Sequence, residues 1–159
     1  KELVSSVVFL RPLASDFLRA HTLQQKYTGE PLIDLDLSYI DFAKKHVNLF
    51  RAMFVDGKFG SKIIADTLMD LGVEKFNEQY PDTDYDQDKI HDIVVANWIS
   101  TTGMAALVVN KIASFNQNQI INVLNAQIHD AMLNNRLSET QENSMFAADD
   151  EASLKDNLA

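Results

Sequence analysis

Two His-Asp dipeptides are the residues of this sequence whose types could hold a metal ion. They are His91-Asp92 and His129-Asp130, and a His-Asp pair is a metal-binding element of some phosphohydrolases. Such a site needs further His and Asp ligands from neighbouring helices. The chain has only four histidines, and neither His21 nor His46 has a companion at a useful spacing. We therefore expect both dipeptides to be partly exposed or to be polar partners between helices, and we predict no metal and no cofactor.

Other catalytic patterns are absent from the sequence. A di-iron bundle needs Glu-x-x-His on two helices, and the nearest match is a single Asp88-x-x-His91. The run Gly57-x-x-Gly60-Ser61-Lys62 lacks the spacing of a phosphate-binding loop, and no Gly-x-Ser-x-Gly occurs. The chain also has no cysteine, which excludes thiolate metal sites, cysteine nucleophiles and disulfides. We therefore predict that the chain is not an enzyme.

A group of large apolar side chains mixed with a few polar ones is more informative. Small-molecule pockets have this composition, although a solid core has it too. His46 is the sharpest member, because it falls within an apolar row and would need a partner or a ligand if it were buried. The ligand-binding candidates are Phe42, His46, Phe50, Met53, Phe54, Trp98, Thr101 and Thr102.

The periodicity that positions these residues is helical throughout, and we predict an all-α fold. Apolar residues recur at three- and four-residue intervals, while five Gly and three Pro separate the segments. Ser61 is a candidate N-cap for the third helix. The long helix has apolar rows on two sides, and its short connection predicts that the last helix lies antiparallel beside it. The first predicted helix covers about 2–21, and the second begins at 34 or 36 and ends at 54. The third begins at 61 and is weakened near its end by Gly72. The fourth begins in the acidic loop at 81–88 and ends at about 114, and the fifth covers about 119–135.

Charge divides the chain unevenly. The net charge is −9, and residues 70–92 and 138–159 hold eight and six acids against two and one lysines. A chain without a basic stripe is a poor nucleic-acid binder by itself. No uncharged apolar run reaches membrane-spanning length, because polar residues interrupt the stretch 90–115. We therefore expect a cytoplasmic protein with no membrane partner.

The composition predicts one domain followed by a tail. The length suits a single core, and apolar periodicity continues to about residue 137. From Ser138 onward it stops and the charge becomes acidic. We predict one domain over 1–137 and a disordered or loosely docked tail over 138–159.

Two segments resemble the sensor domains of TetR-type transcriptional regulators. The run from Tyr39 to Phe54 is similar to their Phe-Ala-x-x-His-Pro-x-Leu-Phe-x-x-Met-Phe stretch, with Val47 in the place of Pro. The run from Trp98 to Leu107 is similar to their Trp-x-x-x-His-Gly-x-x-x-Leu segment, with Thr102 in the place of His. The order and separation of the two segments also agree, and the resemblance extends over about residues 1–136.

The resemblance implies a TetR-like C-terminal helical bundle in a repressor, with residues 1–137 as its effector-binding and dimerisation domain. The last two long helices would pair with those of a second copy in a four-helix interface, and the preceding helices would enclose an effector pocket. Lys1-Glu2-Leu3 is similar to the segment that follows the DNA-binding unit of the family. Operator DNA would thus be bound only through a helix-turn-helix domain that is absent from this chain. The implied dimer contacts are Ala106, Val109, Ile121, Leu124, Ile128 and Met132.

The same predicted helices also allow a different interpretation of the function. A dimeric all-helical adaptor or interaction module would use the aromatic residues only to fill its core. A basic helix-turn-helix encoded upstream would favour the regulator, and substrate-dependent turnover would favour an enzyme.

Overall fold

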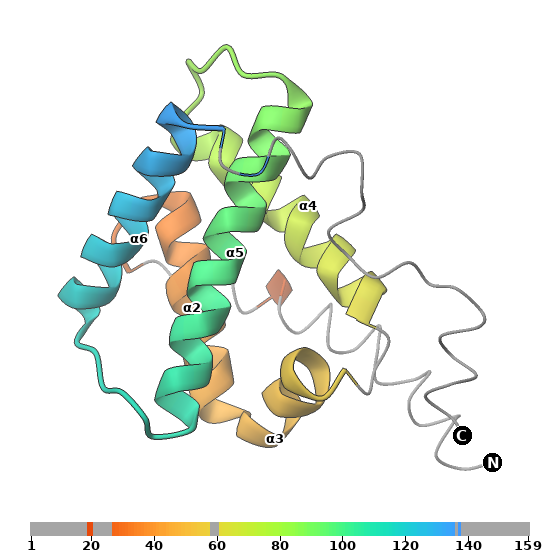
Figure 1. The fold of residues 1–159 in the computed structure, drawn as a ribbon, viewed down its shortest axis with the longest axis vertical. Coiled ribbons are helices and arrows are strands. Elements are labelled where there is room, and N and C mark those ends of the chain that lie inside the picture. Colours follow the sequence, from red (N-terminus) through yellow and green to blue (C-terminus); the bar gives the residue numbers. More distant parts are fainter. Residues whose placement is uncertain (1–18, 21–26, 58–60, 136, 138–159) are drawn as a thin grey trace.

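The computed structural model describes residues 19–20, 27–57, 61–135 and 137 (Figure 1). Every regular element in these ranges is a helix, which confirms the predicted all-α class. The predicted first helix, apart from Arg19 and Ala20, and the predicted tail lie outside the described residues. The elements are α2 (Pro31–Lys45), α3 (Val47–Phe50), the π-helix η1 (Arg51–Val55), α4 (Ser61–Gln79), α5 (Gln87–Val109) and α6 (Gln117–Leu133).

Helix α2 begins earlier than the acidic residues that were expected to start it. Pro31 occupies its first turn, where a missing N–H costs nothing. The Asp34 carboxylate instead fixes the preceding loop, because it accepts hydrogen bonds from the backbone N–H groups of Thr28 and Gly29 at 2.8 and 3.1 Å. Asp36 is also inside the helix and is buried. Both acids therefore have tertiary roles that the prediction of a helix start did not foresee.

The segment predicted as one helix to Phe54 is broken at His46. This residue has φ −127° and ψ 56°, outside the helical region, so α2 ends and α3 begins there. The chain then widens into η1, which closes with a bond of 2.7 Å from the Asp56 N–H to the Arg51 carbonyl. The break turns the second half of the predicted helix away from the axis of α2.

Helix α4 begins at Ser61, as predicted, and continues through Gly72 without interruption. The glycine has a packing role, because a Cβ at this position would overlap Cγ1 of Val94 on α5. Only a residue without a side chain allows the two helices to approach so closely. Gly72 therefore marks the contact point of α4 and α5.

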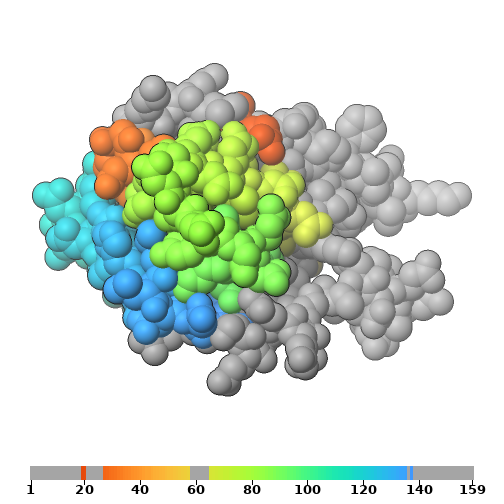
Figure 2. Space-filling view, turned by 90° about the horizontal axis from the view of Figure 1, so that it is seen from above, coloured from red at the N-terminus to blue at the C-terminus, as the bar shows by residue number. Residues whose placement is uncertain are grey.

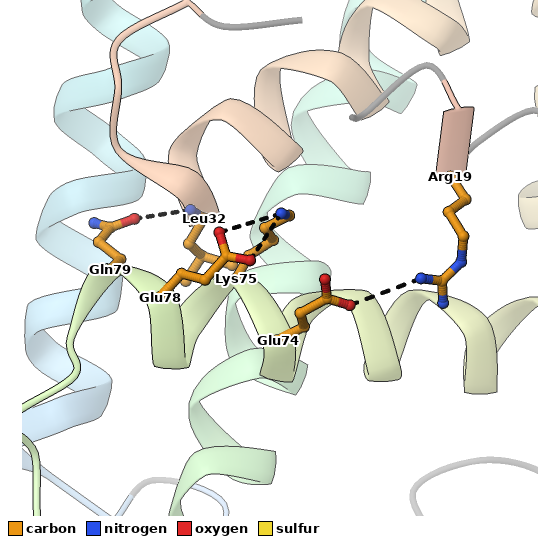
Figure 3. Close-up of polar contacts among 6 residues, drawn as sticks. All are labelled: Arg19, Leu32, Glu74, Lys75, Glu78 and Gln79. Atoms are coloured by element: carbon orange, nitrogen blue, oxygen red, sulfur yellow. Dashed lines mark hydrogen bonds and ion pairs between the residues drawn. The ribbon is translucent and has the colours of Figure 1, made fainter. Parts of the chain in front are cut away.

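Polar contacts fix the end of α4 to the start of α2 (Figure 3). The Gln79 side-chain oxygen accepts the N–H of Leu32 at 2.8 Å, which satisfies one of the first-turn donors that a helix leaves unpaired. Nearer the middle of α4, the guanidinium of Arg19 lies 3.7 Å from Glu74. That pair is half exposed, so it adds little stability.

Helix α5 is central and contacts α2, α4 and α6 (Figure 1). It begins at the N-cap Asp86, whose side chain accepts the N–H of Lys89 at 2.8 Å. It ends at Val109 rather than near Ser114, because the chain turns through Asn110 and a left-handed Lys111 at φ 58°. The acidic loop therefore starts the helix as predicted, but the helix is shorter than its apolar pattern suggested.

By length and hydropathy alone, α5 could cross a membrane, unlike the expectation from its polar interruptions. Its best window has a mean hydropathy of 1.5, and 44% of that window is buried within the chain. The interrupting residues, such as Asn97 and Thr101, are polar but uncharged. A core helix that packs against three neighbours has a similar composition.

Helix α6 lies beside α5, and the start of α5 meets the end of α6, as expected for antiparallel neighbours. Asn116 and Gln119 form a reciprocal capping box at its start. At its other end, the Lys89 ammonium donates to the carbonyl of Ala131 at 2.7 Å and to that of Asn134 at 3.2 Å. Figure 2 shows this meeting from above, with the first turns of α5 in green beside the last turns of α6 in blue.

The core lies where α2, α5 and α6 meet, with α4 closing the remaining side. Its side chains come from every long helix, so no helix can leave without exposing apolar surface. The largest fully buried side chains are Phe42, Phe50, Phe76, Leu32, Ile33, Leu71, Ile93, Leu124, Ile128 and Val95.

Candidate functional site

A small cavity between α2, α4 and α5 contains the most unusual polar group of the described structure. Its volume is about 20 Å³, close to that of one water molecule. The lining residues from α2 and α5 include polar ones, whereas the described lining residues from α4 are Leu68 and Gly72. The described residues of the lining are Leu35, Asp36, Tyr39, Leu68, Gly72, Val94, Asn97, Trp98 and Thr101.

Asp36 is the polar centre of this cavity. Its side chain is 4% exposed, and its Oδ2 accepts a hydrogen bond of 2.7 Å from the Asn97 amide. Thr101, one turn further along α5, donates its hydroxyl proton to the backbone carbonyl of Asn97 at 2.9 Å. The bond from Asn97 by itself favours the charged form of the Asp36 carboxyl.

Burial acts on the Asp36 carboxyl in the opposite direction and dominates. Loss of hydration raises the pKa of this carboxyl from 3.8 to about 8, and the bonds from Asn97 and Thr101 only partly oppose the rise. No cation of the described residues contributes to the shift. A carboxyl group without a counter-ion keeps its proton when it is buried. The cavity therefore holds a neutral acid at pH 7.

Two aromatic side chains stand next to this acid. The hydroxyls of Tyr39 and Thr102 share a hydrogen bond of 3.1 Å, which joins α2 to α5 a second time. Burial raises the pKa of Tyr39, so its phenol stays neutral. The indole of Trp98 also lines the cavity and is partly exposed. Tyr39 and Trp98, here called the aromatic wall, thus lie between the Asp36 carboxyl and the protein surface.

The predicted ligand residues separate into three groups. Trp98 and Thr101 line the cavity, and Thr102 supports its wall through Tyr39. His46 is exposed at the helix break, with its ring 5.4 Å from that of Phe42. Its imidazole is therefore not buried, and burial does not oblige it to bind a ligand. The remaining four residues pack away from the cavity: Phe42, Phe50 and Met53 are buried in the core, and Phe54 is partly buried against Tyr39 and Phe50.

The predicted dimer residues also differ in position. Leu124 and Ile128 are fully buried within this chain, so they have no surface for a second copy. Four others keep partial exposure, namely Ala106, Val109, Ile121 and Met132. Of the six exposed large apolar side chains in the described ranges, all but Val55 belong to α5, α6 or their connection: Ile99, Leu107, Ile112, Val123 and Leu133.

The His-Asp dipeptides do not converge. His129 and Asp130 are exposed on α6, whereas Asp92 is buried on α5. His91 borders a surface groove of about 380 Å³ between α4 and the start of α5, where Asp70 and Asp88 also lie. In the part of the chain with described coordinates, no group of three metal-ligating side chains forms.

Sequence reasoning did not identify Asp36 and Asn97 as site residues. Asp36 was interpreted as a helix start, and Asn97 as an interruption of an apolar stretch. A signal was nevertheless present, since Asp36 precedes Tyr39 and Ala43 at three- and seven-residue spacing on an apolar row. Asn97 likewise stands between Val94 and Thr101. A polar residue within a buried row is the pattern that would have revealed both.

Comparison of the chain with protein-family models, with curated proteins and with solved structures found no match.

Proposed function

We propose that this chain is the sensor domain of a TetR-type transcriptional repressor. It binds a small-molecule effector between its helices, forms a homodimer, and has no enzymatic activity of its own. In the full protein, a helix-turn-helix unit N-terminal to Lys1 contacts operator DNA. The observation that carries the proposal is the cavity between α2, α4 and α5, with a buried acid from α2 bonded to α5.

The exposed surface of α5 and α6 supports the homodimer. Ile99 is 58% exposed and Leu107 is 37% exposed, one turn on either side of Gly103, where an added Cβ would meet no atom within 4 Å. Val123 on α6 is 50% exposed. Exposed apolar side chains beside a small residue suit close packing of a second helix pair. The interface in this proposal is the outer face of the two helices, and Leu124 and Ile128 support it from within.

The position of the cavity supports effector control. It lies where α4 packs against α2 and α5, so a ligand that enters must move α4 or a side chain of the wall. An effector changes DNA affinity only when it binds the two conformations of the dimer unequally. A cavity with room for only about one water molecule meets this requirement, because a larger ligand favours the expanded form.

The alternative is a dimeric helical adaptor. It would use the same exposed face of α5 and α6, but it has no need of a buried acid at a helix junction. A hydrophobic residue at position 36 would fill that space at lower cost. Asp36 thus favours the sensor over the adaptor.

The first experiment is a native mass spectrum of the purified chain, whose subunit mass is 17.9 kDa. The proposal expects a dimer, with an added small-molecule mass that disappears on denaturation when effector is retained. Addition of candidate effectors to the ligand-free dimer then tests binding directly. A monomer at micromolar concentration would contradict the homodimer. A dimer that binds no small molecule would favour the adaptor.

A further inference from the structure

We propose that the cavity between α2, α4 and α5 binds an organic ammonium ion, with Asp36 as the counter-ion and with Tyr39 and Trp98 against its apolar part. The inference rests on the proposed function, because it assigns the chemical class of the effector for the same cavity.

The groups around the cavity select for a cation. Among the described residues that line the cavity, Asp36 is the single carboxyl group, and none is a lysine, an arginine or a histidine. An anionic ligand would meet no positive charge from these residues. An ammonium group would pair with Asp36 and could also donate to the Thr101 hydroxyl. The chain as a whole has a net charge of −9, which attracts cations to its surface.

The walls favour an ammonium ion with an apolar substituent. Leu35, Leu68 and Val94 present apolar surface from three helices. Tyr39 and Trp98 add aromatic surface, and the face of an aromatic ring attracts cations through its quadrupole. A metal ion is disfavoured, because the cavity offers one carboxyl group and mostly apolar neighbours. A small amine with an aryl or alkyl group carries both the positive charge that pairs with Asp36 and the apolar surface that the walls favour.

Binding exchanges one proton for one cation. In the free protein Asp36 keeps its proton, and in the complex the carboxylate faces the ammonium group while the proton goes to solvent. Tyr39 is the other titratable side chain of the lining, and it stays neutral because burial raises its pKa. Of the α4 side chains that the structure describes, no titratable one lines the cavity, and the described lining residues from α5 are Val94, Asn97, Trp98 and Thr101. Affinity must therefore increase with pH while Asp36 is protonated.

The ligand must open the cavity, since about 20 Å³ holds no more than a water molecule. Trp98 is the partly exposed member of the aromatic wall, so rotation of its indole would enlarge the site towards the surface. It is also the only tryptophan of the chain. Its fluorescence and its indole N–H resonance therefore report on this cavity alone.

The test uses three probes of similar size, benzylammonium, benzyl alcohol and benzoate, each titrated while the Trp98 signals are followed. We expect a saturable change with benzylammonium and a much weaker one with the other two. The apparent Kd should fall about tenfold per pH unit between pH 6 and 7.5, as one proton is released. Asp36→Asn should weaken benzylammonium binding about 10- to 100-fold, the range for loss of a charged hydrogen-bond partner.

Asp41→Asn is the matched control, because Asp41 lies on the same helix but pairs with Lys45 at 2.9 Å outside the cavity. It should bind benzylammonium like the unmodified chain. Equal binding of benzyl alcohol, or unchanged binding by Asp36→Asn, would overturn the ammonium assignment and leave the cavity as an effector site. If none of the three probes changes the Trp98 signals, the ammonium assignment is overturned as well. A monomeric chain in the native mass spectrum would instead contradict the proposed function.

Discussion

Asp36 and Asn97 are 61 positions apart in the sequence, and a buried hydrogen bond of 2.7 Å joins their side chains. The bond connects α2 with the centre of α5, where most surrounding side chains are apolar. A buried polar pair of this kind is compatible with a stable fold only when both groups are hydrogen-bonded, because an unpaired polar group is costly to bury. Their position beside the cavity makes them the first residues to test.

Asp36→Asn should change how stability depends on pH. The folded chain holds the Asp36 proton up to a pKa of about 8, whereas the ordinary value is 3.8. This proton stabilises the folded state at low pH, and its contribution is lost as the pH rises from about 4 to 8. The loss is at most about 1.4 kcal/mol per pH unit. Urea unfolding at pH 5 and pH 8 should therefore show a larger decrease for the unmodified chain than for Asp36→Asn.

The difference between the two chains isolates Asp36, since all other groups titrate in both. Asp41→Asn should keep the pH dependence of the unmodified chain. Parallel stability curves for the unmodified chain and Asp36→Asn would show that Asp36 is ionised in the fold.

Gly72→Ala should destabilise the contact of α4 with α5. The new methyl group would overlap Val94, and overpacking of this kind costs about 1–3 kcal/mol. Val94→Ala in the same chain should recover part of the loss, because it removes the overlapping methyl groups. Gly103→Ala is the control within a helix. Its methyl group would meet no atom of its own chain within 4 Å, so at a concentration where the chain is monomeric it should stabilise by about 0.5–1 kcal/mol. Denaturant unfolding of the four chains tests this, and equal stabilities for both alanine substitutions would contradict it.

Ile99→Asp should convert the proposed homodimer to a monomer. The side chain is 58% exposed on α5, so the substitution leaves the core intact but puts a charge into the interface. Val55→Asp is a matched control, because Val55 is 55% exposed on η1, outside that face. Native mass spectrometry at one protein concentration gives the readout. Loss of the dimer in both variants, or in neither, would remove Ile99 from the interface.

Lys89→Met should loosen the end of α6. The ammonium group donates to the carbonyls of Ala131 and Asn134 and to the Asn135 side chain, the last at 2.8 Å. Loss of such charged hydrogen bonds costs about 1.5–3 kcal/mol. Lys45→Met removes an exposed pair with Asp41 and should cost much less, because solvent screens a pair of this kind. Amide exchange in the last turn of α6 should increase only in Lys89→Met. Equal exchange in both variants would contradict the capping role.

The sequence was sufficient for the elements that depend on local pattern. The periodicity placed α4, α5 and α6 within a few residues of their observed starts, because capping residues and apolar rows act over one or two turns. It was not sufficient for the break at His46, where the run to Phe54 remains apolar on one side. The end of α5 at Val109 depends on a left-handed Lys111, a residue type that gives no turn signal.

The candidate site was harder to predict, because its polar residues are defined by contacts between helices. Trp98 and Thr101 were identified from their segment, and both line the cavity. Leu124 and Ile128 were correctly expected to face inward on α6, but the pattern could not distinguish the chain's own core from a second copy. An apolar row in the sequence indicates that its side chains are buried, but it does not indicate whether they pack against the same chain or against a second copy.

The contact at Gly72 also has a mechanical consequence. With a rise of about 1.5 Å per residue, α4 extends about 16 Å from this point to Ser61 and about 10 Å to Gln79. Gln79 is held to the start of α2 by its bond to Leu32. A tilt of α4 about Gly72 would therefore move the Ser61 end about one and a half times as far as the Gln79 end. Gly72, the pivot of such a tilt, lines the cavity, so a small rotation of α4 at the cavity corresponds to a larger displacement at Ser61.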